Sequence, residues 1–271
     1  MVSRRKVLGY GANTAAVLVL PKLIGPRLRA PAVTDRPILT DDFTTLGTQE
    51  IIGRTIVDST GVPYTWTQLY PSPAWRSGPF FSTGDPGIVD GKLVRRDPDS
   101  AMYPGLLLPR VPSRVEVDFM FDPNGRGGKS VFIHLFADTD GTKTTVELPL
   151  HLSIGEKGYA VKAVSTTAGE SVLTGFGRFP DVGNVKYADG TQLAYGVLHT
   201  VILDMVKDRL TITFPVATNT PPVTLIDARL TQARHPGGGD GRFLVLEDES
   251  DSGIEPYNAF FGVRINLGKL A

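Results

Sequence analysis

Glu116 and Asp118 are the residues whose types and spacing point most directly to chemistry. One residue separates them in an alternating segment, so both carboxylates share one face of a β-strand. His134 lies in the next alternating segment, where Phe132 and Phe136 are expected on the same face as the imidazole. If the two strands pair with Glu116 opposite His134, two carboxylates, an imidazole and two rings line one surface. Carboxylate pairs act as acid and nucleophile in glycoside hydrolysis, and aromatic faces stack on sugar rings.

Each of these residues also has a purely structural explanation. Carboxylates at alternate positions of an outer strand are often only solvated, and His134 could instead be a half-buried strand histidine. His151 and His199 stand among apolar strand residues and are expected to be core or interface histidines. No two histidines have the spacing of a metal site along the chain, which disfavours zinc. Catalysis by Glu116, Asp118 and His134 is therefore expected only if the protein is an enzyme.

A proline-stiffened loop at residues 70–76 carries two rings and a guanidinium. Tyr70, Trp75 and Arg76 are candidate ligand-binding residues at the rim of a groove, because proline lowers the entropy of the loop and the rings offer stacking area. Trp75 could equally close one end of a sandwich. The rings of Phe132 and Phe136 complete this set of candidate ligand-binding residues.

Acidic residues in one turn suggest a structural ion. Asp138-Thr139-Asp140-Gly141 supplies alternating carboxylates and a turn glycine, a fragment of the pattern that calcium loops use. The downstream bidentate glutamate is missing, and Asp-Gly is also an ordinary hairpin turn. Asp138 and Asp140 are thus weak candidate calcium ligands, and no other cofactor is expected.

Strands must position these groups, because nearly every apolar segment after residue 40 alternates with a period of two. Residues 115–121 and 146–154 are clear examples, and residues 198–206 and 209–214 flank a polar turn as a hairpin does. No amphipathic helix longer than two turns is expected after residue 40. About a dozen strands joined by turns rich in Gly and Pro predict an all-β protein, a two-sheet antiparallel β-sandwich in one domain.

Composition excludes several classes of function. The 271-residue chain has no cysteine, which excludes disulfides, thiol catalysis and Cys-ligated zinc. Its formal charge is zero, but six of its 28 basic residues lie in the first 30 positions. The rest of the chain has 22 basic against 28 acidic residues, a net charge of −6. An acidic body disfavours nucleic acid as a partner, because phosphate binding needs a basic surface.

The N-terminal segment has the layout of an export signal. Basic residues at 4–6 precede an apolar run at 9–20, and small residues follow at 30–32. The adjacent arginines resemble the twin-arginine signal, which a receptor reads. We therefore expect residues 1–32 to be an export signal and the protein to be secreted, outside the cytoplasm. The alternative is a basic assembly arm; the apolar run is too short to span a bilayer, so no stable membrane span is expected after export.

The order of the apolar segments resembles that of the concanavalin A-like lectin/glucanase superfamily, including its laminin-G-like members. The resemblance covers roughly residues 38–268 and is carried by residues 39–43, 64–66, 88–94, 114–119, 199–203, 210–212 and 261–265. It implies a jelly roll of two curved antiparallel sheets with the binding groove on the concave face. Many members bind sugars and some cleave them, but a fold alone establishes neither activity.

One motif is similar to that of family 16 laminarinases, which carry Glu-x-Asp-x-x-Glu or the same motif with one inserted residue. Glu116 and Asp118 match its first two members. Asp122 stands where the longer form of the motif has its last glutamate. The resemblance therefore assigns no catalytic acid/base residue to this chain.

Three functions remain open from the sequence. The first is non-catalytic recognition of a polysaccharide or cell-surface glycan, as in a lectin. The second is a glycoside hydrolase or polysaccharide lyase acting on an extracellular polysaccharide. The third is a structural or phage-tail adhesion module. Carbohydrate is the expected partner in the first two.

Overall fold

The computed structural model describes residues 36–45, 47–68, 87–94, 104–109, 111–123, 130–139, 146–166, 182–187, 191–215, 222–226, 243–249 and 258–268. The elements in these residues are all β-strands, and none of the described residues forms a helix able to cross a membrane. Residues 1–32, where the export signal is predicted, lie outside the described part.

The strands, in chain order, are β1 (Ile38–Asp41), β2 (Thr48–Glu50), β3 (Thr55–Val57), β4 (Pro63–Gln68), β5 (Gly87–Val89), β6 (Lys92–Val94), β7 (Pro104–Leu107), β8 (Pro112–Met120), β9 (Ser130–Thr139), β10 (Val146–Gly155), β11 (Gly158–Thr166), β12 (Val182–Lys186), β13 (His199–Val206), β14 (Arg209–Thr213), β15 (Val223–Ile226), β16 (Phe243–Glu249) and β17 (Ala259–Leu267).

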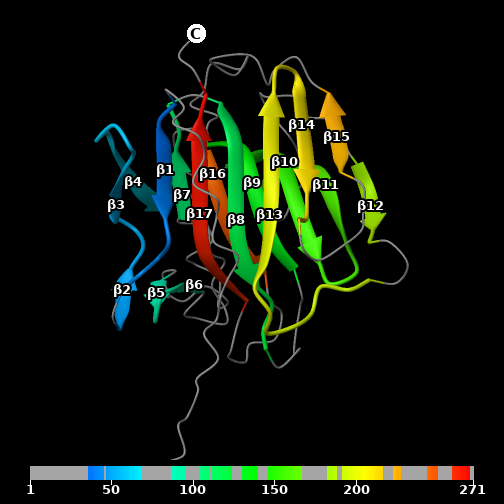
Figure 1. Ribbon diagram of the computed structural model, residues 1–271, viewed down its shortest axis with the longest axis horizontal. Helices are drawn as coiled ribbons and strands as arrows, with labels where there is room; N and C mark the ends of the chain where they lie inside the picture. The colour runs from blue at the N-terminus through cyan, green and yellow to red at the C-terminus, as the bar shows by residue number, and fades with distance from the viewer. Residues whose placement is uncertain are drawn as a thin grey trace, which may run out of the picture. The chain divides into compact units, whose positions relative to one another are not determined.

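These strands form two antiparallel sheets that lie face to face (Figure 1). The nine-stranded sheet has the order β15-β14-β13-β8-β17-β6-β5-β2, and β1 also pairs with β17. The eight-stranded sheet has the order β12-β11-β10-β9-β16-β7-β4-β3. The predicted all-β fold, a two-sheet antiparallel sandwich, is confirmed.

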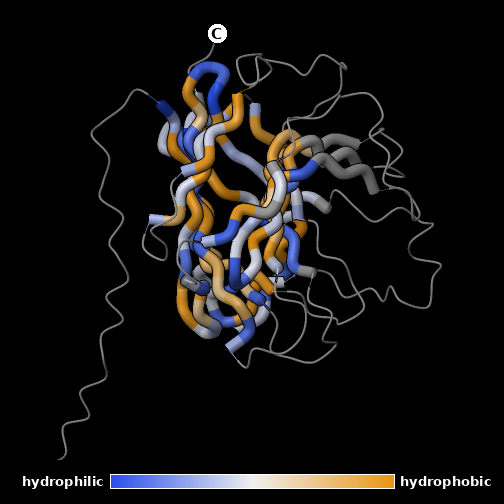
Figure 2. Tube along the Cα trace, turned by 90° about the vertical axis from the view of Figure 1, so that its right-hand side faces the viewer, coloured by the Kyte–Doolittle hydropathy of each residue, from blue (hydrophilic) through white to orange (hydrophobic). Residues whose placement is uncertain are grey.

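Alternation along each strand builds the core between the sheets. In β13, and in β8 from Val115 onward, every second side chain is buried, and Figure 2 shows hydrophobic positions recurring along the strands of both layers. Val117 and Phe119 from one sheet and Ile133 from the other are fully buried members of one apolar cluster. Because a fully buried Val, Ile or Phe side chain stabilises a fold by about 1.5–3 kcal/mol, this cluster dominates the stability of the sandwich.

Tight turns join neighbouring strands where the sequence allows a positive φ. Asp90 and Gly91 connect β5 to β6 with φ values of 49° and 75°. Two residues with positive φ are what a type I′ hairpin turn requires, and Asp-Gly is among its preferred pairs. The predicted hairpin around residues 207–208 is confirmed as β13 and β14, with φ of 55° at Lys207.

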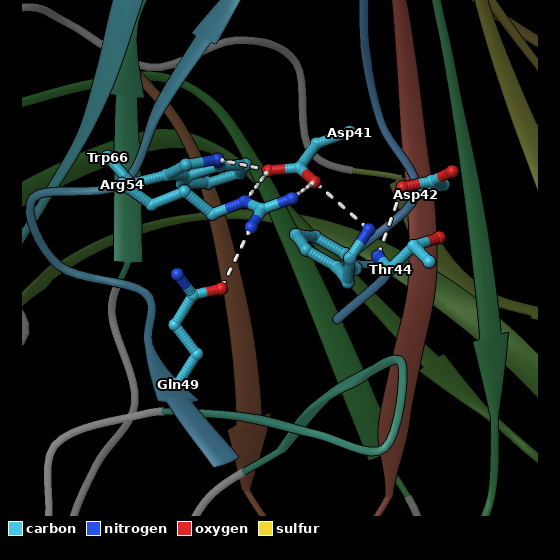
Figure 3. Close-up of polar contacts among 7 residues, drawn as sticks. Asp41, Asp42, Thr44, Gln49, Arg54 and Trp66 are labelled. Atoms are coloured by element: carbon cyan, nitrogen blue, oxygen red, sulfur yellow. Dashed lines mark hydrogen bonds and ion pairs between the residues drawn. The ribbon is translucent and has the colours of Figure 1, made fainter. Parts of the chain in front are cut away.

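A buried carboxylate links the two sheets near the start of the described chain (Figure 3). Asp41 ends β1 in the nine-stranded sheet, and its side chain is fully buried. Arg54 donates two hydrogen bonds to it at 3.1 and 3.0 Å, and Trp66 Nε1, from β4 in the other sheet, donates a third at 2.9 Å. The backbone N–H of Phe43 donates a fourth at 2.9 Å, and Gln49 Oε1 accepts from Arg54 at 3.1 Å. These donors compensate for the desolvation of the carboxylate.

We expect Asp41→Ala to lower the free energy of unfolding by about 3–5 kcal/mol, because it leaves Arg54 and the buried Trp66 N–H without their acceptor. Urea unfolding followed by tryptophan fluorescence measures the change. Asp42→Ala is the matched control, since its carboxylate accepts local hydrogen bonds from Thr44, an exposed one from the backbone N at 3.0 Å, and its loss should cost less than about 1 kcal/mol. Equal losses in the two variants would contradict a special role for Asp41.

Candidate functional site

Polar and aromatic side chains gather on the outer face of the eight-stranded sheet. In β9, Val131, Ile133 and Leu135 belong to the core cluster, so Phe132 and His134 point away from the core. The strand register places His151 of β10 directly opposite His134. Glu247 of β16 lies directly opposite Phe132 on the other side. Two consecutive strands, β9 and β10, and the sequence-distant β16 therefore bring two imidazoles, a carboxylate and a ring together.

The contacts within this group, which we call the histidine cluster (His134, His151 and Glu247 with Phe132), are close. His134 Nε2 lies 2.6 Å from Glu247 Oε2, and the two imidazole centroids are 4.8 Å apart. The Phe132 ring is stacked on His134 at 6.4 Å and lies 4.8 Å from His151. His134 is fully buried, Phe132 and Glu247 are each 6% exposed, and His151 is partly exposed.

Burial determines the protonation of the two imidazoles. It lowers the pKa of His134 to about 3, and it lowers the pKa of His151 to about 3 with a smaller contribution from His134. Both rings are therefore neutral at pH 7. The donor in the hydrogen bond between His134 Nε2 and Glu247 Oε2 depends on the tautomer of the ring, and because the ring is neutral the contact is not an ion pair.

A groove of about 440 Å³ lies on the same face, beside the histidine cluster. Its lining comes mainly from β10, β11 and the turn between them: Ser130, Ser153, Gly155, Glu156, Lys157, Gly158, Tyr159, Ala160, Lys162, Val185 and Lys186. Ser153 is paired with Phe132, and Lys162 is paired with His151, so the groove and the cluster are neighbours on one surface.

The turn at one end of the groove is held by specific contacts. Glu156 accepts a hydrogen bond from the Tyr195 hydroxyl and pairs with Lys157 at 3.4 Å. A Cβ at Gly158 would stand 2.2 Å from the Val185 carbonyl oxygen, so only glycine allows β12 to approach this closely. Small residues on the outward positions of β10 and β11 thus leave the space that forms the groove.

Glu116 and Asp118 lie on the opposite side of the sandwich, on the outer face of the nine-stranded sheet. Their strand β8 pairs with β13 and β17, not with β9. Arg114 Nε donates to Glu116 at 2.5 Å and Arg114 Nη1 to Asp204 at 3.0 Å, while Asp118 accepts from the Thr200 hydroxyl. Glu116 is thus part of a charged network on a β-strand face.

The predicted pairing of Glu116 with His134 is therefore wrong. Both strands expose alternate residues as expected, but each belongs to a different sheet, so their outward faces point in opposite directions. Glu116, Asp118 and His134 do not meet in one site. Of the residues predicted to share this surface, only His134 and Phe132 lie together.

The predicted common face of Phe132, His134 and Phe136 is also not observed. Phe136 has a φ of 63°, and the pairing register of β9 with β16 shifts next to it. Such a bulge reverses the alternation, so Phe136 joins the core cluster and is 3% exposed. Phe132 packs against the two histidines, and neither ring offers an open face for stacking on a sugar.

Several predicted residues lie outside the described part of the chain. These are Tyr70, Trp75, Arg76 and Asp140. Asp138 is a residue of β9, opposite Glu147. Ligand binding by the loop at 70–76 and calcium binding by the two aspartates stay predictions.

His151 and Glu247 are the cluster residues that sequence reasoning missed. A signal for His151 was present, because Leu150, Leu152 and Ile154 alternate toward the core and so direct His151 outward. Glu247 lies within β16, directly after its apolar residues 243–246, but nothing in the sequence indicates that this strand is the neighbour of β9. Spacing along the chain cannot reveal three ligands that lie on three different strands.

Comparisons with known proteins give only distant similarities. No protein-family model matches the chain, and no curated protein matches it. Among solved structures, LamAcat from Zobellia galactanivorans is similar, with a TM-score of 0.48 and 11% identity over 86% of this chain and 98% of that chain. SCLam, a non-specific endo-beta-1,3(4)-glucanase from family GH16, has a TM-score of 0.45 and 13% identity over 87% and 92%. A galectin from Caenorhabditis elegans has a TM-score of 0.32 and 11% identity over 60% and 89%.

Glucanases and galectins are both concanavalin A-like jelly-roll proteins, the class that the sequence resembles. At these identities and TM-scores, the similarity carries no argument about the chemistry of this chain.

The environment of Asp118 leads to a pH-dependent prediction. Burial, with a smaller contribution from Glu116, raises the pKa of Asp118 above 3.8, although the Thr200 hydroxyl opposes this shift. The folded chain thus holds this proton more tightly than the unfolded chain, so the ionised carboxyl costs stability above its folded pKa, and that cost disappears below pH 3.8.

We expect Asp118→Asn to raise the free energy of unfolding at pH 7, because the amide still accepts from Thr200 without a charge to desolvate. The gain should shrink as the pH falls through the folded pKa. Denaturant unfolding of both proteins over a pH series measures it, with Asp208→Asn in the β13–β14 turn as control. A gain that is equally large at neutral and at acidic pH would contradict the explanation.

Proposed function

We propose that this protein recognises a glycan in the groove on the outer face of the eight-stranded sheet. The observation that carries the proposal is the groove itself, about 440 Å³ in volume, whose lining combines Ser130, Ser153 and small residues with charged side chains. Hydroxyls and backbone groups over a shallow floor suit the dense hydroxyls of a saccharide. The resemblance to concanavalin A-like lectins and glucanases also implies a groove on one outer face of the sandwich.

The charges around the groove narrow the class of glycan. Its lining includes Lys157, Lys162 and Lys186, while Glu156 is the single carboxylate among the lining residues that the structure describes. Glu156 is already bonded to Tyr195 and paired with Lys157, whereas Lys162 and Lys186 are exposed. Two exposed ammonium groups beside one groove favour a polysaccharide that carries carboxylate or sulfate groups.

An enzyme acting on the same kind of polysaccharide is the second candidate. His134 with its Glu247 hydrogen bond lies next to the groove, but burial lowers the pKa of its imidazole to about 3, which makes it a weak general base near neutral pH. A catalytic set of Glu116, Asp118 and His134 has no such support, because it would need groups from both outer faces. Binding without cleavage is the simpler proposal, since His134 is fully buried.

We expect the protein to bind sodium polygalacturonate more tightly than laminarin, a neutral glucan. Lys162→Glu with Lys186→Glu should weaken polygalacturonate binding by about tenfold or more, because both ammonium groups are replaced by carboxylates. Arg209→Glu, at an exposed position of β14 in the other sheet, is the matched control and should leave affinity unchanged. Affinity electrophoresis or calorimetry measures the binding.

Product formation is monitored in the same samples. Release of reducing ends or of an unsaturated product would replace the binding proposal by the enzyme proposal. No binding and no release from either polymer, with folded protein, would overturn both and favour the structural or adhesion module.

We also propose that the chain is exported by the twin-arginine-like signal in residues 1–32, which fits recognition of an extracellular polysaccharide. Expression of the full chain in a bacterium with a twin-arginine pathway tests this. Mature protein should begin near residue 31 or 33 by N-terminal sequencing, and Arg4→Lys with Arg5→Lys should abolish export. Mature protein with an intact Met1 would contradict the proposal and support an assembly arm.

A further inference from the structure

The histidine cluster contains metal-ligating side chains that glycan recognition does not require. His134, His151 and Glu247 each offer one ligand atom, and these three atoms lie within 4.8 Å of one another. They come from three adjacent strands, β9, β10 and β16, of one sheet. A rigid sheet therefore holds two nitrogen donors and one oxygen donor at a single point.

The donor set is suited to a particular class of ion. Two imidazoles and one carboxylate are ligands that zinc and other divalent first-row metals take, whereas calcium prefers oxygen alone. Ligand atoms about 2.1 Å from a tetrahedral zinc ion lie about 3.4 Å from one another. A shift of about 1 Å in the side chains would therefore close the present arrangement around an ion.

An unpartnered ring nitrogen in the cluster favours ligation. The Nδ1 atom of His151 is buried and has no hydrogen-bond partner. A buried ring nitrogen without a hydrogen-bond partner lowers the stability of the fold. A metal ion bound by this ring would offset that cost, either by binding this nitrogen or by turning the ring.

The burial of the three side chains indicates how an ion reaches the cluster, and their number indicates how the ion is coordinated. His151 is the partly exposed member of the three, and its strand neighbour Lys162 lines the groove. An ion can therefore reach the cluster from the groove side. Three protein ligands leave the fourth tetrahedral position open, which is the arrangement of zinc sites that also bind water or a ligand.

We propose that His134, His151 and Glu247 bind one divalent transition-metal ion, with zinc as the expected occupant, on the outer face of the eight-stranded sheet. The site does not depend on the identity of the glycan or on the glycan proposal. Because the ion would displace the hydrogen bond between His134 and Glu247, metal binding and that hydrogen bond are alternatives.

The test uses the full chain, freed of metal with a chelator and titrated with zinc in a calorimeter. We expect one zinc ion per chain. Cobalt, added instead of zinc, should give the intense visible absorption of a tetrahedral site, and zinc should abolish that absorption by displacement. The chain has no cysteine, so thiolates cannot contribute to the spectrum.

His151→Asn and Glu247→Gln remove one ligand each and should lower zinc affinity by about 100-fold or more. Glu247→Gln keeps an oxygen acceptor for His134, and His151 is partly exposed, so both variants are expected to fold; circular dichroism checks this. His199→Gln is the control, because His199 is buried in the other sheet with its Nε2 bonded to Ala194 O at 2.8 Å. It should bind zinc as the wild type does.

No zinc binding, or an octahedral cobalt spectrum with weak absorption, would overturn the proposal. Equal zinc affinity in the wild type and both ligand variants would also overturn it, since the ion would then sit elsewhere. Zinc binding without glycan binding would support the metal site and contradict the proposed function. Glycan binding without zinc binding would contradict the metal site and support the proposed function.

Discussion

The apolar interface between the two sheets determines how every other part of the molecule is arranged. Because strand side chains alternate, each residue buried against the opposite sheet directs its neighbours outward. The core positions of β9, such as Ile133, thereby place His134 on one outer surface. The core positions of β8, such as Val117, place Glu116 on the other. A shift of one residue in either register would exchange the core and outer faces of that strand.

Polar contacts then refine what the apolar core establishes. The buried Asp41 carboxylate joins β1 of one sheet to Trp66 of the other, and it accepts four hydrogen bonds from three residues, Phe43, Arg54 and Trp66. Hydrogen bonds of this kind have strict geometry, so they restrict how the sheets can slide where hydrophobic contact alone is permissive. At the opposite edge, the close approach at Gly158 has the same effect on β12.

The outer face of the eight-stranded sheet combines two properties in neighbouring rows of side chains. Serine, glycine and alanine leave an open groove over β10 and β11, while His134 and Glu247 form a buried polar pair one strand away. An open surface for a polymer and an enclosed group of metal-type donors thus share β10 through Ser153 and His151. The outer face of the other sheet carries the Arg114, Glu116 and Asp204 network instead.

Local pattern alone determined much of the fold and part of the site. Alternation predicted the strands, the hairpin of β13 and β14, and the outward direction of His134 and Phe132, because period two is a property of neighbouring residues. It could not reveal that β8 and β9 belong to different sheets, or that a bulge turns Phe136 into the core. Nor could it bring Glu247 and His151 to His134. Strand neighbours are chosen by packing of the whole core, so only the tertiary structure decided which outward side chains meet.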